Sequence, residues 1–386
     1  MFITADPNDI LNGKITDVYF DRALKILKAR NINPMVKAEF IAKNLPNNWP
    51  WALYTGVGEA MELMQHLKVK VRTMREGSVF YPFEPVMEIE GRYQDFCVYE
   101  TAILGLICQA SGVSTRASRM KKLAGDRLIM SFGARRMHPI LAPMIERNAY
   151  VGGCDGVAVV KSGEVIGEDP MGTMPHALIL CLGSTVEAIK AYDEVLDPKL
   201  KRVALIDTFQ DEKFEVLNVA EALGKRLYAV RFDTPGSRRG NFYRILEEAR
   251  WELELRGQGH VKFFVSGGIN EEDIPILNPV VHGYGIGTAI SNAPVVDFAM
   301  DIVEVDGKPF AKRGKWSGSK RVIVCARCGE RKIVPNNGGE NASCSCGGVE
   351  NDILVPALDN GKQLIAQQTP TRIREAVLQS VKNLPM

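Results

Sequence analysis

Four apolar, β-branched stretches in the middle of the chain are each followed by residues that suit a phosphorylated ligand. In chain order these residues are Asp207 with Thr208, Asp233, Ser266 with Gly267 and Gly268, and Gly287 with Thr288. Glycine turns let backbone N–H groups approach a phosphate, and carboxylates can hold a ribose diol or a divalent cation. Any one of these residues could simply form a turn or cap a helix. Their common position after successive strands favours a site for a phosphorylated sugar.

The segment 131–139 places an aromatic ring close to cationic groups. Phe132 is followed by Arg135, Arg136 and His138. An aromatic ring can stack on a planar base, and arginine binds a carboxylate or phosphate through paired hydrogen bonds. Taken alone, the segment could equally be an ordinary surface turn.

Two other motifs are less specific. His176 begins an apolar run, where a lone histidine is more often a hydrogen-bonded core residue than a catalytic one. The glycines of the segment 283–287 do not have the G-x-G-x-x-G spacing, and they lie late in the repeating region. We therefore do not predict a dinucleotide fold.

Four of the eight cysteines crowd into a short stretch near the C-terminus. They form a C-x-x-C pair, Cys325 and Cys328, and a C-x-C pair, Cys344 and Cys346. Four thiolates in two short loops suit a tetrahedral, structural Zn²⁺ site with no open position for catalysis. Iron in the same set of sulfurs is an alternative.

The elements that must position these residues form a regular pattern. Strand-like runs at 156–160, 203–206, 228–232, 261–265 and 280–284 are separated by helical stretches at 185–194, 211–223, 241–256 and from 271 onward. Near-continuous apolar strands alternating with helices indicate a parallel sheet, with its chemistry at the carboxyl ends of the strands. The number of units favours an irregular α/β barrel over an open sheet.

The flanking regions differ from this pattern. Residues 1–120 mix strands, such as 69–73 and 86–90, with helices, and are expected to form an N-terminal α/β domain. Residues 121–300 would form the barrel and carry the site for the phosphorylated sugar. Residues 301–386 would form a C-terminal segment with a small zinc-knuckle module.

Composition limits the function classes. The 386 residues carry 48 basic and 46 acidic side chains, a net charge of +2, which argues against nucleic-acid binding as the main task. The longest apolar runs are too short for a membrane helix, and the first residues lack the pattern of a signal peptide. We expect a cytoplasmic protein that binds neither membrane nor nucleic acid.

At this point the order of motifs resembles the nicotinate phosphoribosyltransferase family, in its compact archaeal form with a C-terminal zinc module. The resembling segments are 17–19, 99–105, 131–139, 169–178, 233–241 and 265–269. The resemblance implies a type II phosphoribosyltransferase fold, assembled as a homodimer or larger homo-oligomer with sites shared between subunits. It also implies that nicotinate and phosphoribosyl pyrophosphate, with Mg²⁺, give nicotinate mononucleotide and pyrophosphate in NAD biosynthesis, coupled to ATP hydrolysis.

The same resemblance implies roles for individual residues. Phe132 would stack on the pyridine ring, with Tyr19 of the partner subunit on the other face. Arg135 and Arg136 would face the carboxylate and the pyrophosphate, and His138, Thr173 and Arg231 would belong to the substrate site.

The remaining roles concern the sugar, its phosphate and ATP. Asp207 and Asp233 would hold the ribose hydroxyls or Mg²⁺, while Ser266, Gly267, Gly268, Gly287 and Thr288 would surround the 5′-phosphate. His176 aligns with the histidine that family members phosphorylate from ATP.

Other functions remain open at the level of sequence. Quinolinate or nicotinamide could replace nicotinate, although quinolinate would require more cationic residues and a decarboxylation. A zinc-ribbon protein that binds RNA or exchanges a base is an alternative of another class, because residues 312–332 are basic. A non-catalytic nucleotide sensor is a third.

Overall fold

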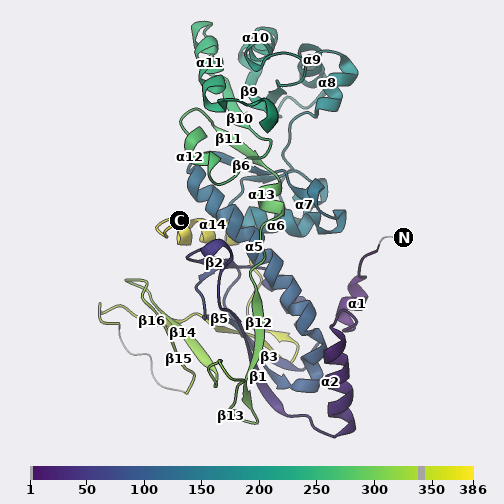
Figure 1. The fold of residues 1–386 in the computed structure, drawn as a ribbon, viewed down its shortest axis with the longest axis vertical. Helices are drawn as coiled ribbons and strands as arrows, with labels where there is room; N and C mark the ends of the chain where they lie inside the picture. Colours follow the sequence, from purple (N-terminus) through teal and green to yellow (C-terminus); the bar gives the residue numbers. More distant parts are fainter. Residues whose placement is uncertain (1–2, 338–343) are drawn as a thin grey trace. The chain divides into compact units, whose positions relative to one another are not determined.

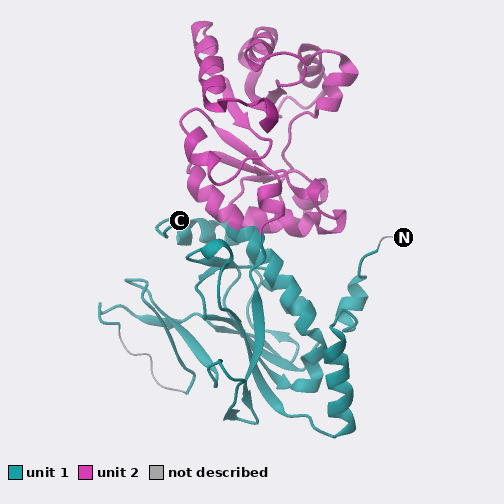
Figure 2. Cartoon of the chain, in the orientation of Figure 1, with its two compact units in different colours: residues 1–115, 294–386 teal, residues 116–293 magenta. Residues whose placement is uncertain are grey.

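The computed structural model describes residues 3–337 and 344–386 and divides the chain into two compact units (Figures 1 and 2). Unit 1 comprises residues 1–115 and 294–386, and unit 2 comprises residues 116–293. The segment 301–386, expected as a separate part, thus belongs with the N-terminal residues. The reason is strand pairing, because β12 (Phe298–Val305) runs antiparallel to β1 (Met35–Ala42) along its whole length.

Unit 1 is built on a seven-stranded sheet in the order β13-β12-β1-β5-β3-β17-β18. Its other strands are β13 (Lys308–Pro309), β5 (Pro85–Arg92), β3 (Val69–Thr73), β17 (Val355–Asp359) and β18 (Lys362–Gln363). Smaller sheets pair β2 (Ala52–Tyr54) with β4 (Ser78–Phe80), and β14 (Lys320–Cys325) with β15 (Arg331–Pro335) and β16 (Glu350–Asp352). The helices are α1 (Pro7–Leu11), α2 (Val18–Ala29), α3 (Val57–Met64), α4 (Tyr93–Phe96), α14 (Pro370–Val381) and α5 (Glu100–Ala124), whose residues from 116 onward belong to unit 2.

The stretch Tyr93–Ala124, which contains α4 and α5, is long and apolar enough to span a membrane by composition alone. One such helix is weak support for a membrane span, because core helices pass the same test. Half of its most apolar window is buried, and Ile103 and Ile107 pack in the core of unit 1. We therefore interpret it as a core helix.

Unit 2 contains a six-stranded, all-parallel sheet in the order β7-β6-β11-β10-β9-β8, so that β7 and β8 form its edges. The strands are β7 (Gly156–Val157), β6 (Leu128–Ser131), β11 (Gly283–Ile286), β10 (Lys262–Val265), β9 (Leu227–Phe232) and β8 (Arg202–Leu205). The helices are α6 (Ala142–Val151), α7 (Val160–Ile166), α8 (His176–Leu182), α9 (Thr185–Val195), α10 (Glu212–Leu223), α11 (Phe242–Leu255), α12 (Asp273–Leu277) and α13 (Thr288–Ser291). This parallel half-barrel confirms the predicted α/β fold class.

Local sequence explains where the helices of unit 2 begin and which side they bury. The Asn241 side chain accepts a hydrogen bond from the backbone N–H of Arg244 and caps α11. Leu246, Ala249 and Leu253 follow at helical spacing and are all buried. The apolar side of α11 therefore lies against the protein interior, as the sequence pattern predicts.

Candidate active site

A cavity of about 610 Å³ opens at the carboxyl ends of the parallel strands of unit 2. It brings together most of the predicted site residues: Phe132, Arg135, Arg136, Thr173, Arg231, Asp233, Ser266, Gly267, Gly268, Gly287 and Thr288. Phe132 follows β6, Asp233 follows β9 and Ser266 follows β10. Adjacent parallel strands thus deliver an aromatic ring, cations, a carboxylate and glycine turns to one space.

Two carboxylates lie at this edge of the sheet with defined partners. Asp233 Oδ1 accepts a hydrogen bond from Ser266 Oγ at 2.6 Å. His176 Nε2 lies 3.2 Å from Asp207 Oδ1. Ligand atoms of His176, Asp207 and Asp233 all lie within 4.8 Å of one another, close enough to share one cation. Burial raises the pKa of Asp207, and the nearby His176 opposes that shift.

Arg231 links the aromatic ring to the rest of the cavity. Its Nη1 donates a 2.6 Å hydrogen bond to Thr173 Oγ1, and its guanidinium carbon lies 5.7 Å from the centroid of the Phe132 ring. Within the described residues, Arg231 Nε is buried and has no hydrogen-bond partner. An unsatisfied buried donor is costly, so a ligand oxygen at this position would be stabilised.

The glycine turn after β10 requires glycine for conformational reasons. Gly267 and Gly268 have φ of +84° and +80°, a left-handed conformation that other residues rarely adopt. Arg239 fixes this turn, because its Nε donates to Thr234 O at 2.7 Å and its Nη2 to Ser266 O at 2.6 Å. The turn is held open beside the cavity before any ligand arrives.

Glu146 is a cavity residue to which the sequence analysis gives no role. The fully buried Glu146 lines the cavity and accepts hydrogen bonds from the backbone N–H groups of Ala158 and Val159, at 3.2 and 2.9 Å. Its position among the apolar residues of α6 is a usable signal, because a buried carboxylate requires partners.

Two predicted site residues lie elsewhere. Tyr19 belongs to α2 in unit 1, where its ring is 58% exposed and its hydroxyl donates a long 3.5 Å hydrogen bond to Asp17 Oδ2. His138 is exposed, and its Nδ1 accepts a hydrogen bond from the backbone N–H of Ile140 at the start of a short turn. Their predicted contacts with substrate remain predictions.

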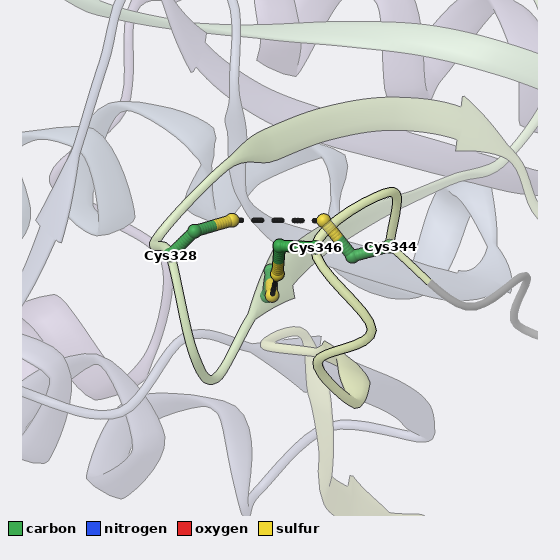
Figure 3. Close-up of side chains that lie close together, drawn as sticks. Cys328, Cys344 and Cys346 are labelled. Atoms are coloured by element: carbon green, nitrogen blue, oxygen red, sulfur yellow. Dashed lines mark hydrogen bonds between the residues drawn. The ribbon is translucent and has the colours of Figure 1, made fainter.

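The four clustered cysteines meet beside β14 in unit 1. Their sulfurs all lie within 4.8 Å of one another, with 3.5 Å between Cys325 and Cys346 and 3.6 Å between Cys328 and Cys344 (Figure 3). Backbone N–H groups of Cys328 and Arg327 lower the pKa of Cys325 to about 6, whereas Glu330 and the neighbouring sulfurs raise the pKa of Cys344, so of these two thiols Cys325 more readily supplies the thiolate that metals bind. This donor set fits a four-thiolate metal site.

Gly348, which follows the C-x-C pair Cys344 and Cys346, permits the tight loop at this pair. A Cβ on Gly348 would lie 2.5 Å from Cys325 Sγ. Glycine at this position therefore lets the two cysteine loops approach each other, as the unusual spacing requires.

Comparisons with known proteins agree on the fold and the family. Residues 17–111 match the quinolinate phosphoribosyl transferase N-terminal domain, and residues 113–301 match the C-terminal domain of the same family. A solved structure of nicotinate-nucleotide pyrophosphorylase from Pyrococcus furiosus is 49% identical, with a TM-score of 0.97 over 100% of this chain and 99% of the other.

More distant relatives carry a different name. A nicotinate phosphoribosyltransferase of Mycobacterium tuberculosis is 28% identical over 326 residues, which cover 80% of this chain and 68% of the relative. The human nicotinic acid phosphoribosyltransferase structure is 18% identical with a TM-score of 0.74, over 96% of this chain and 94% of the human one. The last similarity concerns the fold alone.

Proposed function

The chain belongs to the quinolinate phosphoribosyltransferase family, and from that premise we propose that it is a nicotinate phosphoribosyltransferase coupled to ATP hydrolysis. The proposed reaction joins nicotinate to the phosphoribosyl group of phosphoribosyl pyrophosphate and releases pyrophosphate, a step of NAD biosynthesis. That the protein is a phosphoribosyltransferase follows from the family. The identity of the acid substrate and the coupling to ATP hydrolysis are the parts that we propose.

The choice of a planar acid rests on one observation, that Phe132 and Arg231 lie beside each other in the cavity. The Phe132 ring offers a flat apolar surface, and the buried Arg231 Nε beside it has no hydrogen-bond partner in the described part of the chain. A pyridine ring stacked on Phe132 would bring its carboxylate toward Arg231. The carboxylate would then supply the oxygen that this buried donor requires.

The rest of the cavity suits the sugar and the leaving group. The carboxylate of Asp233, which accepts a hydrogen bond from Ser266, would accept hydrogen bonds from ribose hydroxyls, and the glycine turn beside it would offer backbone N–H groups to the 5′-phosphate. Arg135 and Arg136 offer positive charge to the departing pyrophosphate. Catalysis would consist mainly of positioning and charge stabilisation.

Asp207 and Asp233 would hold Mg²⁺, since two carboxylates at this spacing provide the oxygen ligands that it prefers. When bound, the ion neutralises pyrophosphate charge. Around it, Arg231 and Thr173 keep the Phe132 side of the cavity in place through their 2.6 Å hydrogen bond.

His176 and Asp207 support the coupling to ATP. When His176 Nε2–H donates to Asp207, the lone pair remains on Nδ1. Nδ1 would attack the γ-phosphorus of ATP, forming an N–P bond while the bond to ADP breaks. Asp207, whose pKa burial raises, would take up the Nε2 proton as the ring becomes phosphorylated.

Quinolinate is the second candidate substrate. The family models carry that name, and the relative with 49% identity is titled a nicotinate-nucleotide pyrophosphorylase. The cavity also contains three arginines, Arg135, Arg136 and Arg231, which could serve a second carboxylate.

Chromatographic detection of mononucleotide tests the proposal. Nicotinate, quinolinate and nicotinamide are supplied separately with phosphoribosyl pyrophosphate and Mg²⁺, each with and without ATP. We expect product from nicotinate that increases with ATP, and a loss of roughly 100-fold or more in Asp233→Asn. Asp126→Asn, at an exposed position, is the matched control. Product from quinolinate alone would overturn the choice of acid.

The cysteine cluster supports a separate proposal, a structural zinc ion. Four sulfurs at these spacings leave no position for a substrate, so the ion would stabilise β14 and the loops around it. Metal analysis of the purified protein tests its identity, and iron is the alternative outcome.

A further inference from the structure

A second cavity, of about 260 Å³, lies against the strands of the half-barrel in unit 2. It shares Phe132, Thr173 and Arg231 with the larger cavity, and its other end is lined by Lys201 and Tyr228. Tyr228 precedes Arg231 by three residues on β9, which is roughly 10 Å along a strand. The end of the cavity at Tyr228 is therefore separated along β9 from the end at Arg231.

A β-bulge explains how Tyr228 comes to line this cavity. Arg202 of β8 pairs with Leu227 and Val203 pairs with Ala229, so Tyr228 is the extra residue between two register positions. Bulges redirect side chains and recur beside functional sites. The extra residue, Tyr228, lines the cavity and places its hydroxyl beside Lys201 Nζ.

Two lysines surround the Tyr228 ring. Lys201 Nζ lies 3.4 Å from the Tyr228 hydroxyl and 4.5 Å from the ring centroid, and Lys262 Nζ lies 5.0 Å from the same centroid. Hydrogen bonds from Lys262 and Lys201 outweigh the effect of burial and lower the pKa of Tyr228. Of the described residues that line the cavity, Asp169 is acidic while Lys199, Lys201 and Arg231 are basic.

The walls between the two ends are apolar and suit a flat ring. Phe264 lines them, and Gly283 must be glycine because a Cβ there would lie 2.4 Å from the Phe264 ring. The volume is below the roughly 300–1,000 Å³ typical of sites for drug-sized ligands. The cavity therefore suits a monocyclic acid better than a nucleotide.

We propose that this cavity is a second binding site for a monocyclic aromatic carboxylate, separate from the base position on Phe132. The carboxylate accepts hydrogen bonds from Lys201 Nζ and the Tyr228 hydroxyl, which lie side by side at 3.4 Å, and the ring contacts Phe264. That the physiological occupant is the pyridine carboxylate substrate itself rests on the proposed function. The binding of an aryl acid rests on the cavity alone.

Calorimetric titration of the full chain with benzoate, an aryl carboxylate with no ring nitrogen to react, tests the proposal. We expect two sites per chain in the wild type. Replacing both lysines, Lys201→Met with Lys262→Met, weakens one site by roughly tenfold or more and leaves the other intact. Tyr228→Phe, which keeps the ring, weakens the same site less. Lys225→Met, at an exposed position in the same unit, is the matched control.

A single benzoate site in the wild type would overturn the proposal, as would two sites unchanged in the double-lysine variant. Phosphoribosyl transfer is assayed on the same preparations. Transfer with one benzoate site would reject the second site and keep the proposed function. Two benzoate sites without transfer would reject the proposed function and keep the cavity assignment.

Discussion

At the scale of single residues, the proposed coupling to ATP depends on the pair of His176 and Asp207. The Asp207 side chain is almost fully buried. Among the described residues, His176 Nε2 lies within hydrogen-bond distance of its Oδ1. A carboxylate in this environment fixes the imidazole tautomer and can later accept its proton. The proposed transfer uses the cavity around Phe132 and Asp233, which His176 does not line, so ATP coupling and transfer are separable by mutation of His176.

His176→Ala should abolish the stimulation by ATP and leave the basal transfer of phosphoribosyl to nicotinate within a few-fold of wild type. The reason is that the variant lacks the atom that would carry the phosphoryl group while the ring and sugar contacts remain. Product formation and ADP release, measured together, check this. His260→Ala, an exposed histidine of the same unit, should behave as wild type. Equal ATP stimulation in both variants would exclude a phosphoryl-carrying His176.

Asp207→Asn should stabilise the fold at neutral pH while impairing ATP coupling. The pKa of Asp207 is raised in the folded state, so the folded protein binds this proton more tightly than the unfolded chain. The ionised carboxylate then destabilises the fold as pH rises above the unfolded value of about 4. Melting temperatures between pH 4 and 8 should show a gain for the variant that shrinks toward low pH. A gain that does not depend on pH would contradict this assignment.

The site residues that could be identified from the sequence are those that directly follow a strand. Apolar, β-branched runs can be recognised in the sequence, and so can the residues that come after them. Asp233, Ser266 and Gly267 were found in this way. Glu146 was assigned no role because its importance depends on backbone N–H groups of a later loop, at Ala158 and Val159. Such partners appear only when loops are folded together.

At the scale of elements, the parallel half-barrel places the carboxyl ends of its strands at one edge of the sheet, so that residues following different strands meet in one candidate site. The strand runs at 228–232 and 261–265 were predicted within one residue of β9 and β10, because near-continuous apolar runs mark buried parallel strands. The run at 280–284 was shifted from β11 (Gly283–Ile286), where glycines replace the expected β-branched residues. These glycines leave space for the rings of Phe264 and Phe132. Hydrophobic periodicity in the sequence does not indicate this steric requirement.

Gly285→Ala should weaken the binding of the acid substrate without preventing folding. A Cβ at this position would lie 2.5 Å from two atoms of the Phe132 ring and would displace the ring that we propose stacks on the base. We expect KM for nicotinate to rise roughly tenfold and KM for phosphoribosyl pyrophosphate to change little. Gly259→Ala, where the nearest atom is 3.4 Å away, is the control. An unchanged KM for nicotinate would show that the ring is not the base platform.

Loss of the metal should affect stability more than chemistry. Cys328→Ser removes one of four thiolates, and we expect less than one bound metal ion per chain and a lower melting temperature. The exposed Cys181, outside the cluster, provides the control variant Cys181→Ser. Metal content and thermal unfolding check this, with transfer activity measured well below the transition. Loss of activity in a folded, metal-free protein would contradict a purely structural role.

At the scale of the whole molecule, the chain returns to its first unit after completing the second. Residues 298–305 form a strand that pairs with residues 35–42, and this pairing joins segments more than 250 residues apart. Composition located the change of pattern near residue 300 but could not reveal the partner, because strand pairing leaves no local signature. Tyr19 lies in this unit, exposed on α2.

A shared site predicts complementation between two inactive variants. Tyr19→Ala and Asp233→Asn should each be weakly active alone. Mixed by unfolding and refolding, they should recover about a quarter of wild-type activity, because half of randomly formed dimers are mixed and each mixed dimer has one intact site. Mass measurement of the mixture verifies that dimers form. Activity no greater than the sum of the separate variants would place Tyr19 outside its partner's site.

The choice of nicotinate as the acid is tested most directly by competition. Ring-deuterated nicotinate and unlabelled quinolinate are supplied together at equal concentration, with phosphoribosyl pyrophosphate, Mg²⁺ and ATP. Both acids yield nicotinate mononucleotide, quinolinate after losing one carboxylate, so the mass of the product reports which acid was used. We predict that the heavy product dominates and that its excess grows with ATP. A predominantly light product, independent of ATP, would contradict the account.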